Sequence, residues 1–356
     1  IVLIISIAAG IRYGIYSVAL GSLIGYLVAM VIQIPFLYKV GFRFRFSLDI
    51  RNTGVKHTFN MMGPLMIGTG VSQIYLIIDR ILASGLMEGS ISSLNYASKL
   101  MLLPQGVIVM AVGTAIFPTL ANRVASGYID QYSSALTRAL GLVLLIAFPC
   151  GVGLAVLRDP VVRLLFARGA FDETAVVMTA FALLCFSLGL IGQCLIPVVT
   201  RGFYALQDTI TPVKISIAAV LLNLVCSLIL IGPLKHGGLA LANSIAATAN
   251  IMILLWVLVK KVPGLNFTAL GMSATKLGIA SLIMAIVVAT MDNVLAILLI
   301  ENELNLVIRV FVDIVAGAGI YLAMCRLLKV DEYLYLKDLL LDRINSLRHT
   351  KHSSEL

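Results

Sequence analysis

The chain has 356 residues, of which 60% are hydrophobic and only 12% are charged, and its mean hydropathy is +1.04. A water-soluble domain needs far more polar surface, so these values exclude one and indicate an integral membrane protein. The net charge is +9, but the basic residues show no aromatic interleaving and no nucleic-acid motif. We therefore attribute the charge to cytoplasmic loops near anionic lipid head groups, and we expect no nucleic-acid partner.

Apolar runs of about 20 residues follow one another along the chain, long enough for helices that cross a hydrocarbon core of about 30 Å. Because alternating ten-residue strands are absent, the pattern predicts an all-α polytopic bundle. The chain opens on IVLIISIAAG, without Met or a basic signal region, so we interpret it as an N-terminally incomplete chain. We predict one partial and nine full spans: 1–9 (partial), 14–37, 59–86, 91–120, 136–157, 174–200, 211–231, 237–259, 273–291 and 304–327.

The distribution of Lys and Arg predicts the orientation of these spans, because cytoplasmic loops retain basic residues. The connection after 14–37 carries five basic residues, whereas the next connection, 87–90, carries none. The alternation continues along the chain and places the C-terminus in the cytoplasm. After residue 327, leucines mixed with both charge signs predict a short interfacial amphipathic helix.

Five charged residues lie within predicted spans: Asp79, Arg80, Lys99, Arg309 and Asp313. A charge inside the membrane is costly, so each is a candidate functional residue. Arg309 and Asp313 are four residues apart on one helix face, which predicts an intrahelical ion pair. Asp79 and Arg80 point about 100° apart, and we expect Arg80 to reach the nearby membrane interface.

Lys99 interrupts the apolar segment SSLNYASKLMLLPQGV (92–107) about 12 Å below the start of its span. No acidic residue lies three or four positions away. Two partners remain open, an acid on another helix or an anionic ligand in a hydrated cavity, and we favour the ligand. Helix breakers at Pro104, Pro149 and Gly189 indicate kinked helices around such a cavity.

Three blocks of sequence resemble the MurJ (MviN) family of lipid II flippases: LNYASKLMLLPQGVIVMAVGTAIFPTLA (94–121), RGFYALQDTITPVKI (201–215) and IGPLKHGGLALANSIAATAN (231–250). The resemblance implies a two-lobed MATE-like flippase fold with two extra C-terminal helices, within the multidrug/oligosaccharidyl-lipid/polysaccharide exporter superfamily. It implies four segments. Residues 1–52 end the N-lobe, 53–261 form the C-lobe with spans 7–12, 262–327 form spans 13–14 and a lipid-tail groove, and 328–356 form the cytoplasmic tail.

The resemblance also implies site residues. Lys99 occupies a position at which the family usually has an Arg that binds the pyrophosphate of lipid II. Lys keeps the positive charge but not the planar fork that can bind two oxygens at once. Some members bind sodium in the C-lobe, and Asp79, Asn223 and Asn243 lie where such ligands occur. We expect no other cofactor and no catalytic residue.

The implied function is export of lipid II, the undecaprenyl-pyrophosphate-linked peptidoglycan precursor, across the bacterial inner membrane by alternating access through a cationic central cavity. The expected partners are lipid II, membrane lipids and other cell-wall synthesis proteins. Three alternatives are an exporter of another cargo (a drug/cation antiporter or an O-antigen flippase), an enzyme acting on polyprenyl phosphates, and a structural membrane protein. The sequence contains no DDxxD or HExxH motif, which disfavours the enzyme.

Overall fold

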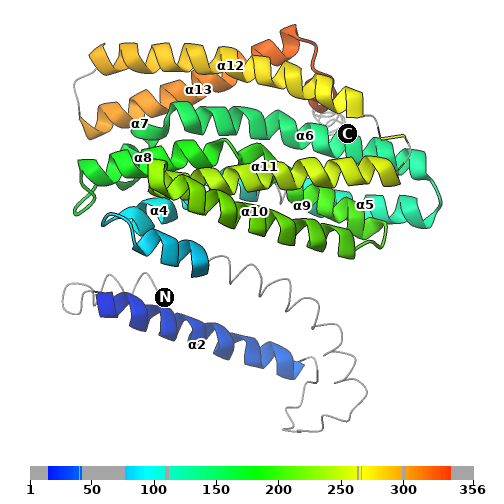
Figure 1. Ribbon diagram of the computed structural model, residues 1–356, viewed down its shortest axis with the longest axis horizontal. Coiled ribbons are helices and arrows are strands. Elements are labelled where there is room, and N and C mark those ends of the chain that lie inside the picture. Colours follow the sequence, from blue (N-terminus) through cyan, green and yellow to red (C-terminus); the bar gives the residue numbers. More distant parts are fainter. Residues whose placement is uncertain are drawn as a thin grey trace, which may run out of the picture. The chain divides into compact units, whose positions relative to one another are not determined.

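The computed structural model describes residues 15–39, 41, 77–108, 112–262, 264–265, 267–298 and 302–337. Every regular element in these ranges is helical (Figure 1). The chain divides into two compact units, residues 1–65 and 66–356. The boundary expected after residue 52 lies outside the described residues, as does the partial span 1–9.

The described part of the first unit is a single long apolar helix, α2 (Ile15–Lys39). Its 25 residues rise about 38 Å at 1.5 Å per residue, enough to cross a bilayer. Lys39 in its last turn places a cation at the negative end of the helix dipole. The helix confirms the span predicted at 14–37.

The second unit is a bundle of helices that begins with helical residues 77–84 and ends with helical residues 331–337. Between them lie α4 (Ser90–Ile108), α5 (Thr114–Ala125), α6 (Ile129–Val156), α7 (Arg158–Phe166), α8 (Glu173–Ser187), α9 (Leu190–Ala205), α10 (Ile210–Leu234), α11 (His236–Lys261), α12 (Phe267–Leu298) and α13 (Glu303–Leu327).

Five helices of this unit confirm predicted spans by their length and apolar composition: α6, α10, α11, α12 and α13. Most of the predicted span 59–86 lies outside the described residues. The predicted span 174–200 is a broken one, in which α8 and α9 meet at an angle of 46°. Within the predicted span 91–120, the structure describes α4 up to Ile108 and α5 from Thr114, and residues 109–111 lie outside the described residues.

One helix, α7, was not predicted from the sequence. Its nine residues, RDPVVRLLF, are too short and too charged to register as a span, and they were placed in an external connection. Pro160, the third residue of α7, suits the first turn of a helix, where its missing N–H would have no partner.

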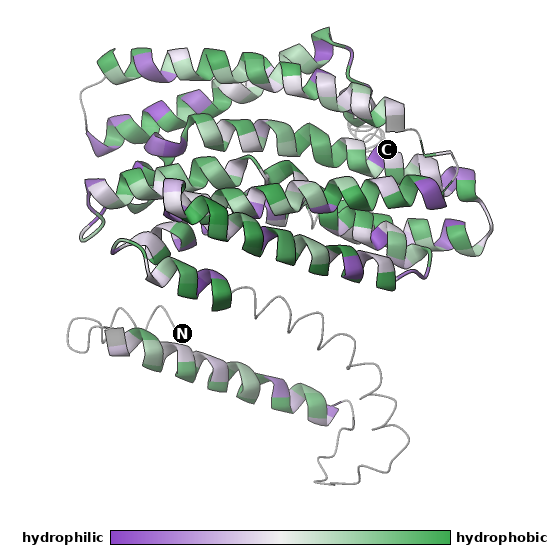
Figure 2. Ribbon diagram, viewed as in Figure 1, coloured by the Kyte–Doolittle hydropathy of each residue, from purple (hydrophilic) through white to green (hydrophobic). Residues whose placement is uncertain are grey.

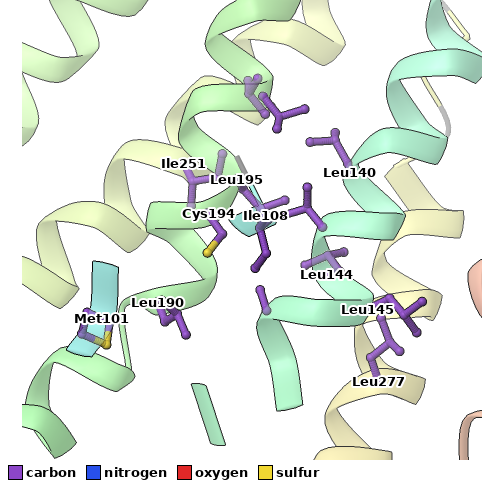
Figure 3. Packing of buried hydrophobic residues seen from close by; sticks show 14 of the residues in the cluster. Met101, Ile108, Leu140, Leu144, Leu145, Leu190, Cys194, Leu195, Ile251 and Leu277 are labelled. Atoms are coloured by element: carbon purple, nitrogen blue, oxygen red, sulfur yellow. The ribbon is translucent and has the colours of Figure 1, made fainter. Parts of the chain in front are cut away.

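The core of the bundle is centred on α6, which packs against α5, α8, α9 and α12. Figure 3 shows Leu140, Leu144 and Leu145 converging with side chains of α9, α11 and α12. The outer surface is apolar too, as Figure 2 shows along α10 and α12. Large side chains such as Leu221 of α10 and Ile286 of α12 are exposed there, as expected of helices whose solvent is lipid.

A side chain of α11 donates hydrogen bonds to the backbone at the break between α8 and α9. The Ser244 hydroxyl donates to the backbone carbonyl of Cys185 at 2.7 Å and lies 3.1 Å from that of Phe186. This contact satisfies carbonyls at the end of α8 that have no water available in hydrocarbon. Gly189 permits the approach, because a Cβ there would lie 2.5 Å from the Ser244 Cα atom.

A polar clamp joins the α9–α10 turn to the end of α11. Asp208 accepts a hydrogen bond from the Thr211 backbone N–H at 3.0 Å and one from the Lys261 ammonium group. Burial by itself would raise the pKa of Asp208, but the hydrogen bonds from Lys261 and Thr211 outweigh it and lower the pKa to about 2. Asp208 and Lys261 both come from segments predicted to be cytoplasmic, so the clamp agrees with their lying on one side.

We predict that Gly189→Ala destabilises the protein by about 1–3 kcal/mol, because the added methyl group separates α9 from α11. Thermal unfolding of the detergent-solubilised protein measures the change. Gly153→Ala is the matched control, since Gly153 also lies in a buried helix but a Cβ there meets nothing within 4 Å. Equal unfolding temperatures for the two variants would contradict the close packing at Gly189.

We predict that Asp208→Asn lowers stability at neutral pH by up to about 1 kcal/mol, a small value because Lys261 is 44% exposed. Since the folded pKa lies below the ordinary value of 3.8, the stabilisation is complete above that value. It disappears as the pH falls through about 2. The difference in unfolding temperature between wild type and variant should therefore shrink on acidification, and a pH-independent difference would disprove the assignment.

Candidate functional site

Lys99 lies on an exposed ridge of α4. Its ammonium nitrogen is 5.6 Å from the centre of the Tyr96 ring, within cation–π range. Tyr96 in turn packs against Phe166 at 4.7 Å and Phe171 at 5.3 Å, measured between ring centroids. These aromatic contacts fix α4 to the connection between α7 and α8 and so hold Lys99 in place.

A polar pocket of about 220 Å³ borders one face of α4. Two amide side chains are linked, since Gln193 Nε2 donates to Asn243 Oδ1 at 2.8 Å, and Gln105 Nε2 donates to the backbone carbonyl of Gln193 at 3.4 Å. The pocket thus joins α4, α9 and α11. Its polar lining residues are Asp79, Arg80, Asn95, Ser98, Gln105, Gln193 and Asn243.

An apolar groove of about 530 Å³ borders the opposite face of α4, where Leu100, Leu103 and Pro104 line it. Its other walls come mainly from α6 and α13, with Met284 and Val288 of α12. At 100° per residue, Lys99 falls on the α4 surface between Asn95 and Ser98 on the polar side and Leu103 on the apolar side. A cation therefore stands between a polar pocket and an apolar groove.

The structure brings together only some of the predicted site residues. Asp79 and Asn243 both line the polar pocket. Asn223 is buried on α10, where its Oδ1 accepts a hydrogen bond from Ser227 at 3.2 Å, and it is not among the residues of that pocket. The three predicted sodium ligands therefore do not line one pocket in this structure, and we derive no step through sodium.

Sequence reasoning missed Gln105 and Gln193, because uncharged amides in apolar runs give a weaker signal than charges. Pro104, which precedes Gln105 and was expected to kink its helix, lies inside α4, which continues to Ile108. Arg80, which we expected to reach the membrane interface, is exposed and also lines the polar pocket. The lining of the pocket therefore includes the cation of Arg80, and Lys99 is not part of it.

The predicted ion pair between Arg309 and Asp313 is wrong. Arg309 Nε donates instead to Asp292 Oδ1 of α12 at 2.5 Å. The sequence placed Asp292 just beyond its span, whereas α12 continues to Leu298 and brings the carboxylate level with Arg309. Asp313 is fully buried, and neither of its carboxylate oxygens has a hydrogen-bond partner among the described residues.

Lys99 forms none of the ion pairs found within the described ranges, which are Arg158–Asp159, Arg163–Glu173, Lys261–Asp208 and Arg309–Asp292. An acidic partner for Lys99, one of the two partners that the sequence left open, is therefore not found within the described ranges. The site is thus a cation without a protein counter-charge in the described chain, placed beside both polar and apolar hollows.

The long apolar helices, with a polar pocket among them, define a polytopic all-α membrane protein. A solved structure titled "Lipid II flippase MurJ, inward closed conformation" has the same fold, with a TM-score of 0.76 and 26% identity over 95% of this chain and 66% of that one. The family described as "Lipid II flippase MurJ" matches residues 1–307. The chain belongs to this family.

Two relatives show the extent of the sequence match. A probable lipid II flippase MurJ from Haemophilus influenzae is 36% identical over 244 residues, which are 67% of this chain and 48% of that protein. Its counterpart from Buchnera aphidicola subsp. Acyrthosiphon pisum is 31% identical over 317 residues, which are 89% and 62% of the two proteins. The chain thus spans between 48% and 62% of the length of these two relatives.

Labelling of engineered cysteines tests whether the Lys99 ridge is open to water. We predict that Lys99→Cys and Ser98→Cys react with a membrane-impermeant maleimide about tenfold or more faster than Ala97→Cys, because access controls thiol reactivity. Ala97 is the matched control, since it lies on the same turn and is 0% exposed. Mass spectrometry of the labelled peptide measures the rates, and equal rates at all three positions would contradict the described face.

Proposed function

We propose that the chain forms part of a lipid II flippase, which moves the undecaprenyl-pyrophosphate-linked precursor from the cytoplasmic to the outer leaflet of the bacterial inner membrane. The observation that carries the proposal is the position of Lys99 between the polar pocket and the apolar groove. The family to which the chain belongs supports the choice of substrate.

The three parts of the site match the three chemical parts of such a substrate. A pyrophosphate needs a cation, a sugar and peptide head needs hydrogen-bonding groups, and a polyprenyl chain needs apolar surface. Lys99 offers a point charge, which attracts phosphate without fixing its orientation as the fork of an Arg does. The amides of the polar pocket offer donors and acceptors for the head.

The physical task is to carry a strongly hydrated head through hydrocarbon, where its desolvation is prohibitive. A hydrated cavity that opens alternately to the two sides removes this cost, while the lipid tail stays in the bilayer. We propose that residues 1–52 complete an N-lobe, 53–261 form the C-lobe and 262–327 the tail groove, with the tail 328–356 in the cytoplasm. No catalytic step is involved.

The test uses a full-length version of the protein in bacterial cells depleted of their own flippase. We predict that Lys99→Ala fails to restore growth and lipid II export, whereas Lys99→Arg restores both. The lost contact is a charge-assisted one, and its removal should weaken substrate binding by about 10- to 100-fold. Export is measured from lipid II that becomes accessible at the outer leaflet.

Two controls keep the result specific. Lys214→Ala removes an exposed cation of α10 that lines neither the polar pocket nor the apolar groove, and it should support growth at the same protein level. Rescue by Lys99→Ala at the wild-type rate would refute the phosphate-binding role. Failure of the wild-type protein to export lipid II, together with transport of a cationic drug or of O-antigen, would favour another cargo of the same superfamily.

A further inference from the structure

Asp313 borders the apolar groove but takes no part in the function proposed above. It lies on α13 with 0% of its surface exposed, and both of its oxygens lack a hydrogen-bond partner among the described residues. The charged groups that face it are Asp292 of α12 and Arg309 of its own helix. Arg309 donates to Asp292 at 2.5 Å, so the guanidinium group is already engaged by the other acid.

Two hollows flank this cluster. On one side, Arg309 lines a polar hollow of about 240 Å³ whose other charged residues are Asp159 and Arg163 of α7 and Glu303 of α13. On the other side, Asp313 borders the apolar groove, in which the other titratable side chains are Cys150 of α6 and Tyr321 of α13. The Tyr321 hydroxyl donates to the Leu145 carbonyl at 2.7 Å and is therefore not directed to Asp313.

The net charge of Asp292, Arg309 and Asp313 indicates whether Asp313 is protonated. Asp292 and Arg309 together are neutral, so an ionised Asp313 would leave one negative charge with no exposed surface and no hydrogen bond. Such a charge is strongly disfavoured in apolar surroundings, whereas a protonated carboxyl group is neutral there. A protonated carboxyl group can also donate its O–H to the neighbouring Asp292 carboxylate.

We propose that Asp292, Arg309 and Asp313 form a proton-binding site between α12 and α13, with Asp313 carrying the proton in this conformation. Release breaks the O–H bond of Asp313 and forms one on an Asp292 oxygen. The proton then passes from Asp292, whose side chain is 15% exposed, to a water molecule. Each transfer moves one proton, and no electron moves.

Arg309 gives this site two arrangements. In the structure it pairs across to α12, but Asp313 lies four residues away on the same face of α13, within reach of an intrahelical pair. Loss of the proton leaves Asp313 charged and attracts Arg309 away from Asp292. The pairing that ties α12 to α13 therefore depends on the proton, which couples proton binding to the packing of the two helices.

Infrared spectroscopy of the full-length protein in lipid nanodiscs tests the proposal without any measurement of transport. We expect a C=O stretching band of a protonated carboxyl group at neutral pH in the wild type, and its loss in Asp313→Asn. Asp292→Asn should also remove the band, because Arg309 then pairs with the ionised Asp313. Glu88→Gln is the control, since Glu88 is exposed in a turn and its replacement should leave the band unchanged.

Asp313→Asn should fold, because its amide has the shape and neutrality of the protonated acid. Asp313→Glu serves as a second variant that keeps an acid, and its band should shift in frequency but persist. Absence of the band in the wild type, or its persistence in Asp313→Asn, would overturn the proposal. Persistence in Asp292→Asn would overturn the role given to Arg309.

Discussion

In a bilayer, backbone groups released by a break in a helix cannot turn to water, so another helix must supply their partners. The break between α8 and α9 shows this constraint, because Ser244 of α11 reaches the carbonyls at the end of α8. Residues of α9 and α11 next to this break also line the polar pocket. Gln193 lies one turn after the break, Asn243 directly precedes Ser244, and the two side chains are hydrogen-bonded in the polar pocket. The contact that closes the break thus also positions the pocket.

Charged side chains within the bundle are under a similar constraint. Each charge within the bundle needs a partner, water or a ligand. Asp292 satisfies Arg309, and the clamp at Asp208 satisfies Lys261, whereas Lys99 stands exposed between two hollows of opposite polarity. Arg309 and Lys261 thus hold helices together, whereas Lys99 forms no ion pair among the described residues and is the cation that we propose meets the substrate.

Much of the fold could be predicted from the sequence, because a membrane helix must satisfy its own backbone and therefore appears as a long apolar run. The spans that became α6, α10, α11, α12 and α13 were found in this way. The break between α8 and α9 was indicated by Gly189, but its support was not, since Ser244 lies more than 50 positions away and leaves no local pattern. The short helix α7 was not predicted. Ion pairs between side chains were harder to predict than the helices. Spacing along α13 indicated Arg309–Asp313, but only the length and packing of α12 show that Asp292 takes that place.

In the function proposed above, Lys99 distinguishes a pyrophosphate lipid from a neutral one, and lipid binding to the purified full-length protein tests this role most directly. Native mass spectrometry can compare undecaprenyl pyrophosphate with undecaprenol, which has the same tail but no phosphate. We predict that wild type prefers the pyrophosphate by about tenfold or more, that Lys99→Arg keeps this preference and that Lys99→Ala loses it. An undiminished preference in Lys99→Ala would contradict the proposed role of Lys99.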